Sequence, residues 1–451
     1  MTLEKYRPLE NSLLTFHDYI PRFLNGTDNP REYLERCLAQ IELLEPKVKA
    51  FVVMNIDSAR KTADASTQRY QAGKPLSVVD GMPFGVKDLY ETIDMKTQMN
   101  SPVYKDWHGI RDSAHAFSLR QGGAIILGKT STTEFGMATP PPTRNPYNYN
   151  KTAGGSSSGS SAAVGASMIP AASGSQVRGS IVRPAGYCAN FALKPTFGAI
   201  NRGGGHSLAP SQSVLGVHAG SLEDCWSTAF YISSHAGGDA GCPGLFGNPT
   251  IAESKNPGAI IRLDSIGWDS TTDSTKEAFE TFLEKLNLRG IKIISRKDDD
   301  RIEKFEEALR EIPDFLFRML GYESRWPLKD YQLSHPESLS QKMIDSLELG
   351  LSVSVDDYRS ILKQRQKLRD LQISLKEIAG SFLLLCSCDP PPDYPYIGDP
   401  VYGDVSSTLG TPAFSLPFIE VDGLPVGIQY MGYPGEDYQL ACNSKWMKEN
   451  L

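Results

Sequence analysis

Two glycine-rich loops, each with serines between its glycines, constrain this chain more than any other part of it. The first reads Gly-Gly-Ser-Ser-Ser-Gly-Ser over residues 154–160, and the second reads Gly-Ser-Gln-Val-Arg-Gly-Ser-Ile-Val-Arg-Pro over residues 174–184. Glycine lets the backbone adopt left-handed conformations and come close to a ligand. Small residues fill almost all of the segment between the loops, so hydroxyl groups are nearly the only side chains there that can carry out chemistry. The pattern predicts a serine-based active site.

A serine hydroxyl is a weak nucleophile at neutral pH, so this site needs a proton acceptor from elsewhere in the chain. None of the seven histidines lies in a motif with an acidic partner. The better candidate is Lys87, which ends an apolar segment, residues 78–87, that Gly81, Pro83 and Gly85 interrupt. Burial disfavours a charged amine, and a neutral amine can accept a proton. Lys87 is therefore predicted to be the base.

Together with further motifs, Lys87 and the two loops resemble the amidase signature family of serine hydrolases. The further motifs follow in the order of the family, and only about residues 255–375 lack the pattern; they lie at residues 128–130, 134–135, 144–146, 193–198, 410–417 and 423–429. The resemblance implies an α/β fold, in which one mixed, twisted sheet of about eleven strands lies between layers of helices.

The resemblance also implies roles for residues of both loops. Ser180 would be the nucleophile, Ser156, after a cis peptide bond, would pass protons, and Lys87 would be the base. In this relay Lys87 takes a proton from Ser156, which takes one from Ser180 as Ser180 attacks a carbonyl carbon, and an acyl-enzyme forms. Backbone N–H groups of the second loop would form the oxyanion hole. They belong to Val177, Arg178, Gly179 and Ser180.

Three positions differ from the commonest form of the family pattern. Gln176 stands where an aspartate is usual, and Val182 displaces the next arginine by one position, to Arg183. Both changes match a branch of the family that reads Gly-Thr-Gln-Thr-x-Gly-Ser-x-x-Arg-Pro-Ala, so Gln176 and Arg183 are expected to support the site. Arg178 replaces a glycine or alanine. It points either away from the cleft or into it, where it would lower the pKa of Lys87 and contact a substrate carbonyl or carboxylate.

Other interpretations of the first loop stay open. A Gly/Ser-rich segment can be a flexible linker. Residues 155–159 also satisfy the Gly-x-Ser-x-Gly pattern, which would make Ser157 the nucleophile on a strand-to-helix turn. No strongly apolar strand precedes this segment, and no downstream acid and histidine pair stands out. Ser157 is therefore expected to support the relay by hydrogen bonding.

Composition favours a large enzyme domain. The chain has 451 residues, 40% of them hydrophobic, and no break in composition divides it, so we expect one domain over residues 1–451. A net charge of −7 without a basic patch argues against nucleic acid as a partner. Seven scattered cysteines favour free thiols in a cytoplasm, and Cys386 and Cys388 lack the second ligand pair of a metal site. No stretch reaches the ~18 apolar residues of a membrane span. We expect a cytoplasmic enzyme without a metal or organic cofactor and without a membrane partner.

Apolar periodicity predicts helices that alternate with strands. Asn29 and Pro30 are typical of a helix start, and apolar residues then recur at helical spacing as far as Leu44. A second helix is predicted over residues 276–288, and short apolar runs predict strands. These runs are residues 124–127, 291–294 and 382–385.

Residues 301–375 contain charged helical stretches with apolar stripes, which we expect to form a helical cap inserted into the domain. Such stripes are more often packing faces than binding faces, but a cap of this kind can wall the substrate pocket. Its candidates for that wall are Phe315, Phe317 and Met319. The stronger candidates for substrate binding are Tyr104 and Met137, in loops near motif residues, and Arg178.

These features predict hydrolysis of the C–N bond of a small amide or carbamate. One alternative is the amidase subunit of a tRNA-dependent amidotransferase, whose partner handles the charged tRNA. Another is a non-catalytic binding protein in which Arg178 closes the site, and a homodimer stays open.

Overall fold

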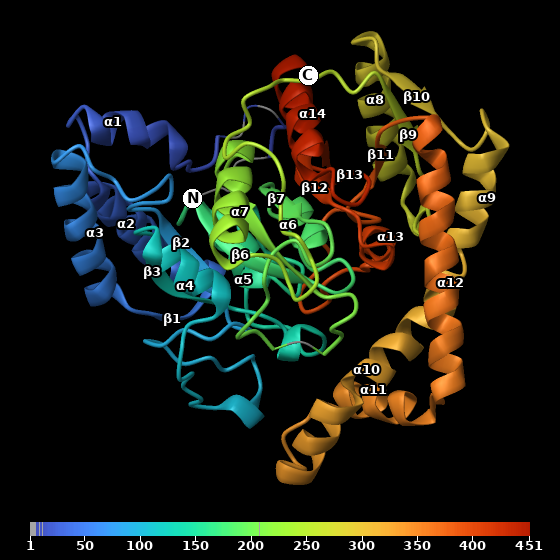
Figure 1. Ribbon diagram of the computed structural model, residues 1–451, viewed down its shortest axis with the longest axis horizontal. Helices are drawn as coiled ribbons and strands as arrows, with labels where there is room; N and C mark the ends of the chain where they lie inside the picture. Colours follow the sequence, from blue (N-terminus) through green and yellow to red (C-terminus); the bar gives the residue numbers. More distant parts are fainter. Residues whose placement is uncertain (1–5, 9, 11, 207) are drawn as a thin grey trace.

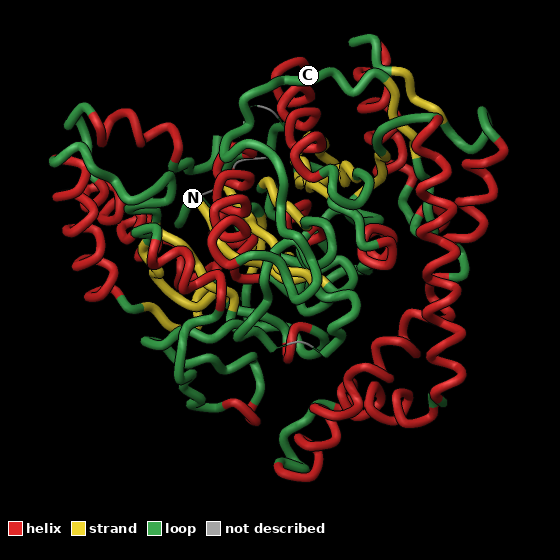
Figure 2. Tube along the Cα trace, viewed as in Figure 1, coloured by secondary structure: helices red, strands yellow, loops and turns green. Residues whose placement is uncertain are grey.

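The computed structural model describes residues 6–8, 10, 12–206 and 208–451, and its centre is an 11-stranded sheet. The strands lie in the order β1-β3-β2-β6-β8-β7-β12-β13-β11-β9-β10. In Figure 1 the sheet runs from β1 on one side of the molecule to β9 and β10 on the other, and helices lie on both faces of the sheet (Figures 1 and 2). Its strands are β1 (Phe51–Met54), β2 (Pro83–Lys87), β3 (Ile125–Thr130), β6 (Ala171–Gln176), β7 (Phe191–Lys194), β8 (Val214–Ala219), β9 (Ala259–Arg262), β10 (Lys292–Ile294), β11 (Phe382–Leu385), β12 (Ala413–Val421) and β13 (Leu424–Met431). A separate two-stranded sheet pairs β4 (Arg144–Asn145) with β5 (Asn148–Thr152).

The large sheet is mixed. Strand β2 runs parallel to both β3 and β6, and β9 runs parallel to both β10 and β11, whereas the pairs between these groups are antiparallel. Every residue of β2 is buried, as expected for a parallel strand covered on both faces. The predicted fold class, a mixed α/β sheet between helices, is confirmed.

The helices are α1 (Ile20–Leu24), α2 (Pro30–Val48), α3 (Ile56–Gln71), α4 (Ala114–Gln121), α5 (Ser158–Gly165), α6 (Val182–Tyr187), α7 (Leu222–Ala236), α8 (Asp273–Leu288), α9 (Asp300–Leu309), α10 (Ile312–Ser334), α11 (Gln341–Ser352), α12 (Val355–Ser374), α13 (Val401–Leu409) and α14 (Asp437–Asn450). Helix α2 begins at the predicted residue and continues past Leu44 to Val48, and α8 ends at the predicted residue and begins three residues before the predicted start at residue 276. Single 3-10 turns lie at η1 (His17–Tyr19), η2 (Pro102–Tyr104), η3 (Glu134–Gly136), η4 (Trp268–Ser270) and η5 (Leu375–Glu377). None of the helices among the described residues is long and apolar enough to cross a membrane.

Local sequence signals account for several of these boundaries. The Asn29 side chain accepts a hydrogen bond from the Glu32 N–H, which caps α2 as predicted. The strand predicted over residues 382–385 is β11, and the strand predicted from residue 124 begins at Ile125 and continues to Thr130.

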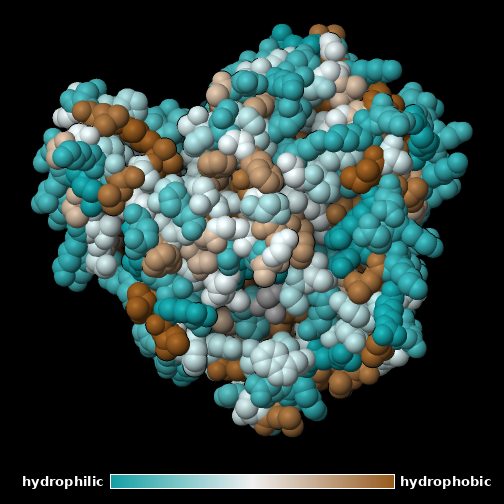
Figure 3. Space-filling model, in the orientation of Figure 1, coloured by the Kyte–Doolittle hydropathy of each residue, from teal (hydrophilic) through white to brown (hydrophobic). Residues whose placement is uncertain are grey.

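Helices α9–α12 extend to one side of the sheet, where α12 forms a long edge and α10 and α11 lie across its end (Figure 1). Helices α10 and α11 approach closely at two glycines, because a Cβ added to Gly350 would lie 2.1 Å from the carbonyl oxygen of Gly321. The visible face of the molecule is largely hydrophilic, with small, separate apolar patches (Figure 3).

Candidate active site

The two serine loops meet at the end of strand β2. Lys87 is the last residue of β2, and the neighbouring parallel strand β6 ends at Gln176 and leads into the second loop. The first loop ends where α5 begins, and the N–H of Ser157 donates to the carbonyl of Ser180 over 3.3 Å. Parallel strands bring their carboxyl ends to one edge, so the topology places Lys87 beside both loops.

The Lys87 amine is surrounded by hydroxyl groups. Its Nζ lies 2.8 Å from Ser156 Oγ, 2.9 Å from Ser157 Oγ and 2.9 Å from Ser175 Oγ. The Ser157 hydroxyl donates to the Ser175 carbonyl. When the amine is neutral it has two N–H donors and one lone pair, so the hydroxyl of Ser156 or Ser175 then donates to it. Lys87 is thus placed to accept a proton from Ser156.

Burial lowers the pKa of Lys87 well below its usual range, because the side chain is fully buried and desolvation disfavours the ammonium. Burial is the cause of this shift, and like-charge repulsion from Arg178, which the sequence left open, is not. His218, on β8, is also kept neutral, since burial, with a smaller effect of Lys87, lowers its pKa to about 3.

The three serines of the relay region differ in how far their side chains are exposed to solvent. Ser180 is 9% exposed, Ser156 is 3% exposed and Ser157 is fully buried. The peptide bond between Gly155 and Ser156 is cis, as the resemblance implies. Ser157 is followed by helix α5, as in a nucleophile elbow, but a fully buried hydroxyl cannot reach a substrate. Its hydrogen bonds to Lys87 and Ser175 fit the supporting role expected of it.

Gln176 and Arg183, the other two residues expected to support the site, bind backbone groups of the two loops. Gln176 is fully buried, and its Oε1 accepts the N–H groups of Ile181 (2.8 Å) and Val182 (3.1 Å) at the start of α6. The buried Arg183 donates from Nη2 to the carbonyl of Gly155 over 2.6 Å, which ties the second loop to the first.

Gly179 of the predicted oxyanion loop packs against the start of α13, because a Cβ on Gly403 would lie 2.3 Å from its Cα. Its neighbour Val177 is held through its carbonyl, which accepts from Gln212 Nε2 over 2.7 Å. The carbonyl of Arg178 accepts from the hydroxyl of Ser407, also on α13.

The Arg178 guanidinium bonds to Asp404 of α13 through both Nε and Nη2. The ring of Phe317, from α10, lies 4.5 Å from the guanidinium carbon and is 48% exposed. Phe315 and Met319, the other two candidates from the cap, are buried, so they pack within it.

Tyr104 belongs to an aromatic cluster beside Ser156. Its hydroxyl lies 2.8 Å from the hydroxyl of Tyr331 on α10, and Phe135 stacks on Tyr331 with centroids 5.2 Å apart. The next residue, Gly136, is so close to the relay that a Cβ there would lie 3.5 Å from Ser156 Oγ. Met137 follows directly and is half-buried.

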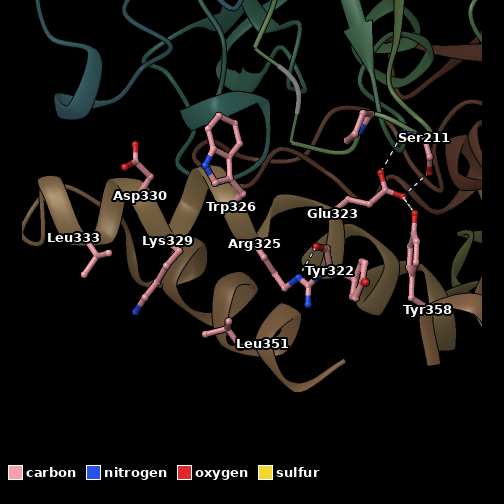
Figure 4. Close-up of a pocket in the computed structure, with 11 residues that line it drawn as sticks. Ser211, Tyr322, Glu323, Arg325, Trp326, Lys329, Asp330, Leu333, Leu351 and Tyr358 are labelled. Atoms are coloured by element: carbon pink, nitrogen blue, oxygen red, sulfur yellow. Dashed lines mark hydrogen bonds between the residues drawn. The ribbon is translucent and has the colours of Figure 1, made fainter. Parts of the chain in front are cut away.

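Helix α10 is also anchored to the core through Ser211. Glu323 accepts from the N–H of Ser211 (3.0 Å), from its hydroxyl and from the hydroxyl of Tyr358 (2.8 Å), as Figure 4 shows. These residues line a groove of about 750 Å³ along α10, to which Trp326 and Leu333 of α10 and Leu351 of α11 also contribute (Figure 4). The groove is not lined by any residue of the serine loops.

Sequence reasoning missed the partners that come from distant segments. Ser175 carried a signal, because it lies inside the second loop and matches a threonine of the branch pattern. Asp404, Ser407 and Gln212 carried none, since an isolated polar residue in a helix or loop has no motif. Among the described residues there is also no group of three or more His, Cys, Asp or Glu side chains that could hold a metal ion.

Comparisons with known proteins identify the family. The Amidase family model matches residues 32–325, and the chain therefore belongs to that family, the amidase signature family. One subunit of the glutamyl-tRNA(Gln) amidotransferase from Roseiflexus castenholzii is 36% identical over 223 residues, 48% of this chain and 45% of the relative, so that match spans about half of the relative. The corresponding subunit from Psychrobacter sp. is 27% identical over 94% of both chains. The fold is that of a solved amidase, with a TM-score of 0.84, 24% identity and coverage of 97% of this chain and 100% of the other.

Proposed function

We propose that this protein hydrolyses an amide C–N bond through Ser180, Ser156 and Lys87. The observation that carries the proposal is the buried Lys87 amine. It lies within hydrogen-bond distance of three serine hydroxyls, and burial lowers its pKa. Lowering the pKa of a lysine favours the neutral amine, which can act as a base.

The proposed reaction uses the relay in both directions. Lys87 takes the proton of Ser156, Ser156 takes that of Ser180, and Ser180 Oγ bonds to the substrate carbonyl carbon. The carbonyl oxygen becomes an oxyanion held by N–H groups of residues 177–180, each worth about 3 kcal/mol in measured cases. The C–N bond then breaks, the relay returns the proton to the leaving amine, and water releases the acyl group from Ser180 by the same path.

Residues 301–375 are proposed to cap this site within a single domain over residues 1–451. Two contacts support this role: Phe317 covers the Arg178 guanidinium, and Tyr331 bonds to Tyr104 beside the relay. The substrate would then contact Tyr104, Met137 and Arg178.

The test is hydrolysis of p-nitroacetanilide, a primary aryl amide and an aryl carbamate by the wild type, Ser180→Ala and Ser234→Ala. Ser234 lies exposed on α7 and is the matched control. Turnover of at least one substrate by the wild type and the control, lost in Ser180→Ala, is the expected result, and the panel ranks carbamates against amides. Turnover retained in Ser180→Ala would refute the assignment of the nucleophile.

A covalent probe tests the nucleophile without a chosen substrate. Phenylmethanesulfonyl fluoride should add one sulfonyl group to the wild type, seen by intact-protein mass spectrometry, and none to Ser180→Ala. Absence of labelling in both, together with no turnover, would favour a binding protein.

A second candidate is one subunit of an amidotransferase, because the relatives from Roseiflexus and Psychrobacter carry that name. Release of ammonia from glutamine only after a partner protein is added would support it. We favour the independent hydrolase, since Gln176 and Arg178 depart from the commonest loop pattern.

A further inference from the structure

The side chain of Arg178 has more N–H donors than its ion pair with Asp404 uses. Arg178 lies two residues before Ser180, so their Cα atoms are at most about 7 Å apart. A guanidinium has five N–H groups, and Asp404 engages Nε and one N–H of Nη2. The Arg178 side chain is 23% exposed, whereas Asp404 is 1% exposed. The exposed part of the fork is therefore directed away from Asp404 and can receive a second acceptor.

Asp404 also fixes the orientation of this fork. Its carboxylate is held by α13, where the neighbouring Ser407 bonds to the Arg178 carbonyl, so both the backbone and the side chain of Arg178 are attached to one helix. Phe317 covers the guanidinium from the α10 side. A donor fixed in this way loses little freedom when it binds a planar anion.

A second cation, Lys342, lies at the start of α11. The N–H of Ser340, two residues before it, donates to Glu134 over 3.2 Å, and Gly136 of the same turn lies beside Ser156, so this end of α11 lies at the proposed site. Lys342 is exposed, and its pKa is lowered first by partial burial and then by the charges of Arg178 and Arg183.

Arg183 adds to the excess of positive charge. It is buried, and although Nη2 bonds to Gly155, its Nε and Nη1 are buried without a hydrogen-bond partner. Among the described residues, Asp404 is within ion-pair distance of Arg178, whereas no carboxylate is within ion-pair distance of Arg183 or Lys342. Two of the three cations therefore lack an ion-pair partner, so this part of the site attracts an anion and repels an ammonium group.

We propose that the substrate of this enzyme carries a carboxylate, which binds between Arg178 and Lys342. This inference rests on the proposed amide hydrolysis and adds to it the charge of the substrate. The carboxylate accepts the free N–H groups of Arg178 and pairs with the Lys342 ammonium, while the amide carbonyl lies at Ser180. A carboxylate on the acyl part and one on the amine part meet the same chemistry, and matched substrates distinguish them.

The test compares two substrate pairs that differ in one carboxylate. For the acyl side the pair is N-succinyl-p-nitroanilide and N-butyryl-p-nitroanilide, and for the amine side it is 4-acetamidobenzoate and acetanilide. The wild type should favour the anionic member of one pair by about tenfold in kcat/KM, the value of one charge-assisted hydrogen bond of about 1.5 kcal/mol. The preference should shrink as NaCl is raised.

Variants assign the preference to the two cations. Lys342→Met and the double variant Arg178→Gln with Asp404→Asn, which leaves no buried carboxylate unpaired, should each reduce the ratio between anionic and neutral substrate to below about threefold. Lys363→Met, at an exposed lysine of α12, should retain the ratio. Equal kcat/KM within both pairs in the wild type, or a ratio that the variants leave unchanged, would overturn the proposal.

Direct binding separates this proposal from the proposed hydrolysis. Calorimetry on Ser180→Ala with the succinyl and butyryl anilides, and with 4-acetamidobenzoate and acetanilide, measures the site without turnover. Tighter binding of an anionic member, weakened by Lys342→Met, supports the carboxylate site even where no substrate is hydrolysed. Equal affinities within both pairs overturn it even where Ser180-dependent hydrolysis is found.

Discussion

The replacement of Gln176 by leucine tests how the second loop is held in place. Gln176 Oε1 accepts two backbone N–H groups, those of Ile181 and Val182, in a region without water access. Leucine keeps most of the volume of the side chain but accepts no hydrogen bond, so both N–H groups lose their partner. Each buried unsatisfied donor costs about 1–3 kcal/mol, which gives a loss of stability of about 2–6 kcal/mol for the pair.

Gln176→Leu should therefore lower the free energy of unfolding by about 3 kcal/mol, measured by urea denaturation followed through tryptophan fluorescence. Gln366→Leu, at an exposed glutamine of α12, is the control, with an expected change within about 0.5 kcal/mol. The loop that holds Ser180 begins at Gln176, so kcat of the variant should fall as well. A Gln176→Leu protein within about 0.5 kcal/mol of the wild type would refute this account of the loop.

Three further predictions concern the base, a buried ion pair and a helix cap. Neutral Lys87 accepts the proton, so kcat/KM should fall as the pH drops through its lowered pKa, while Lys87→Met should lose about 10²–10⁴ in kcat; a profile without an acid limb would contradict the assignment. Asp80 is buried and binds both Arg69 and the backbone, so Asp80→Ala should lower the free energy of unfolding in urea by about 3 kcal/mol, and a loss below about 1 kcal/mol would argue against it. Asn29→Ala removes the cap of α2 and should lower the midpoint of thermal unfolding, with a cost of about 1 kcal/mol that Asn29→Ser should largely restore.

The sequence was informative where the chemistry is local. Lys87 and the serines of both loops lie in short motifs whose small residues are required by close packing, and the Gly155–Ser156 bond is cis as the resemblance implies. The sheet class followed from alternating apolar runs and from the family resemblance. Strand β11 coincides with its predicted residues, because four consecutive apolar residues can be buried on both faces of a sheet.

The sequence did not predict contacts between segments that are far apart in the chain. Asp404 meets Arg178 across more than two hundred residues, and nothing local distinguishes a helical aspartate that binds an arginine from one in solvent. For the same reason the direction of Arg178 stayed open until α13 was placed beside it. Helix α11 was not predicted either, since its packing on α10 depends on two glycines, Gly321 and Gly350, that no periodicity reveals.

The anchoring of α10 at Ser211 restricts how such a chain can diversify. Glu323 holds Ser211, and the adjacent Gln212 holds the carbonyl of Val177 in the loop before Ser180. An exchange of residues 301–375 for a foreign cap, by recombination or by protein engineering, would alter the walls of the site and also remove the acceptor that fixes Ser211. Caps that supply a carboxylate at the position of Glu323 should therefore be interchangeable, while caps without one should need compensating changes around residue 211.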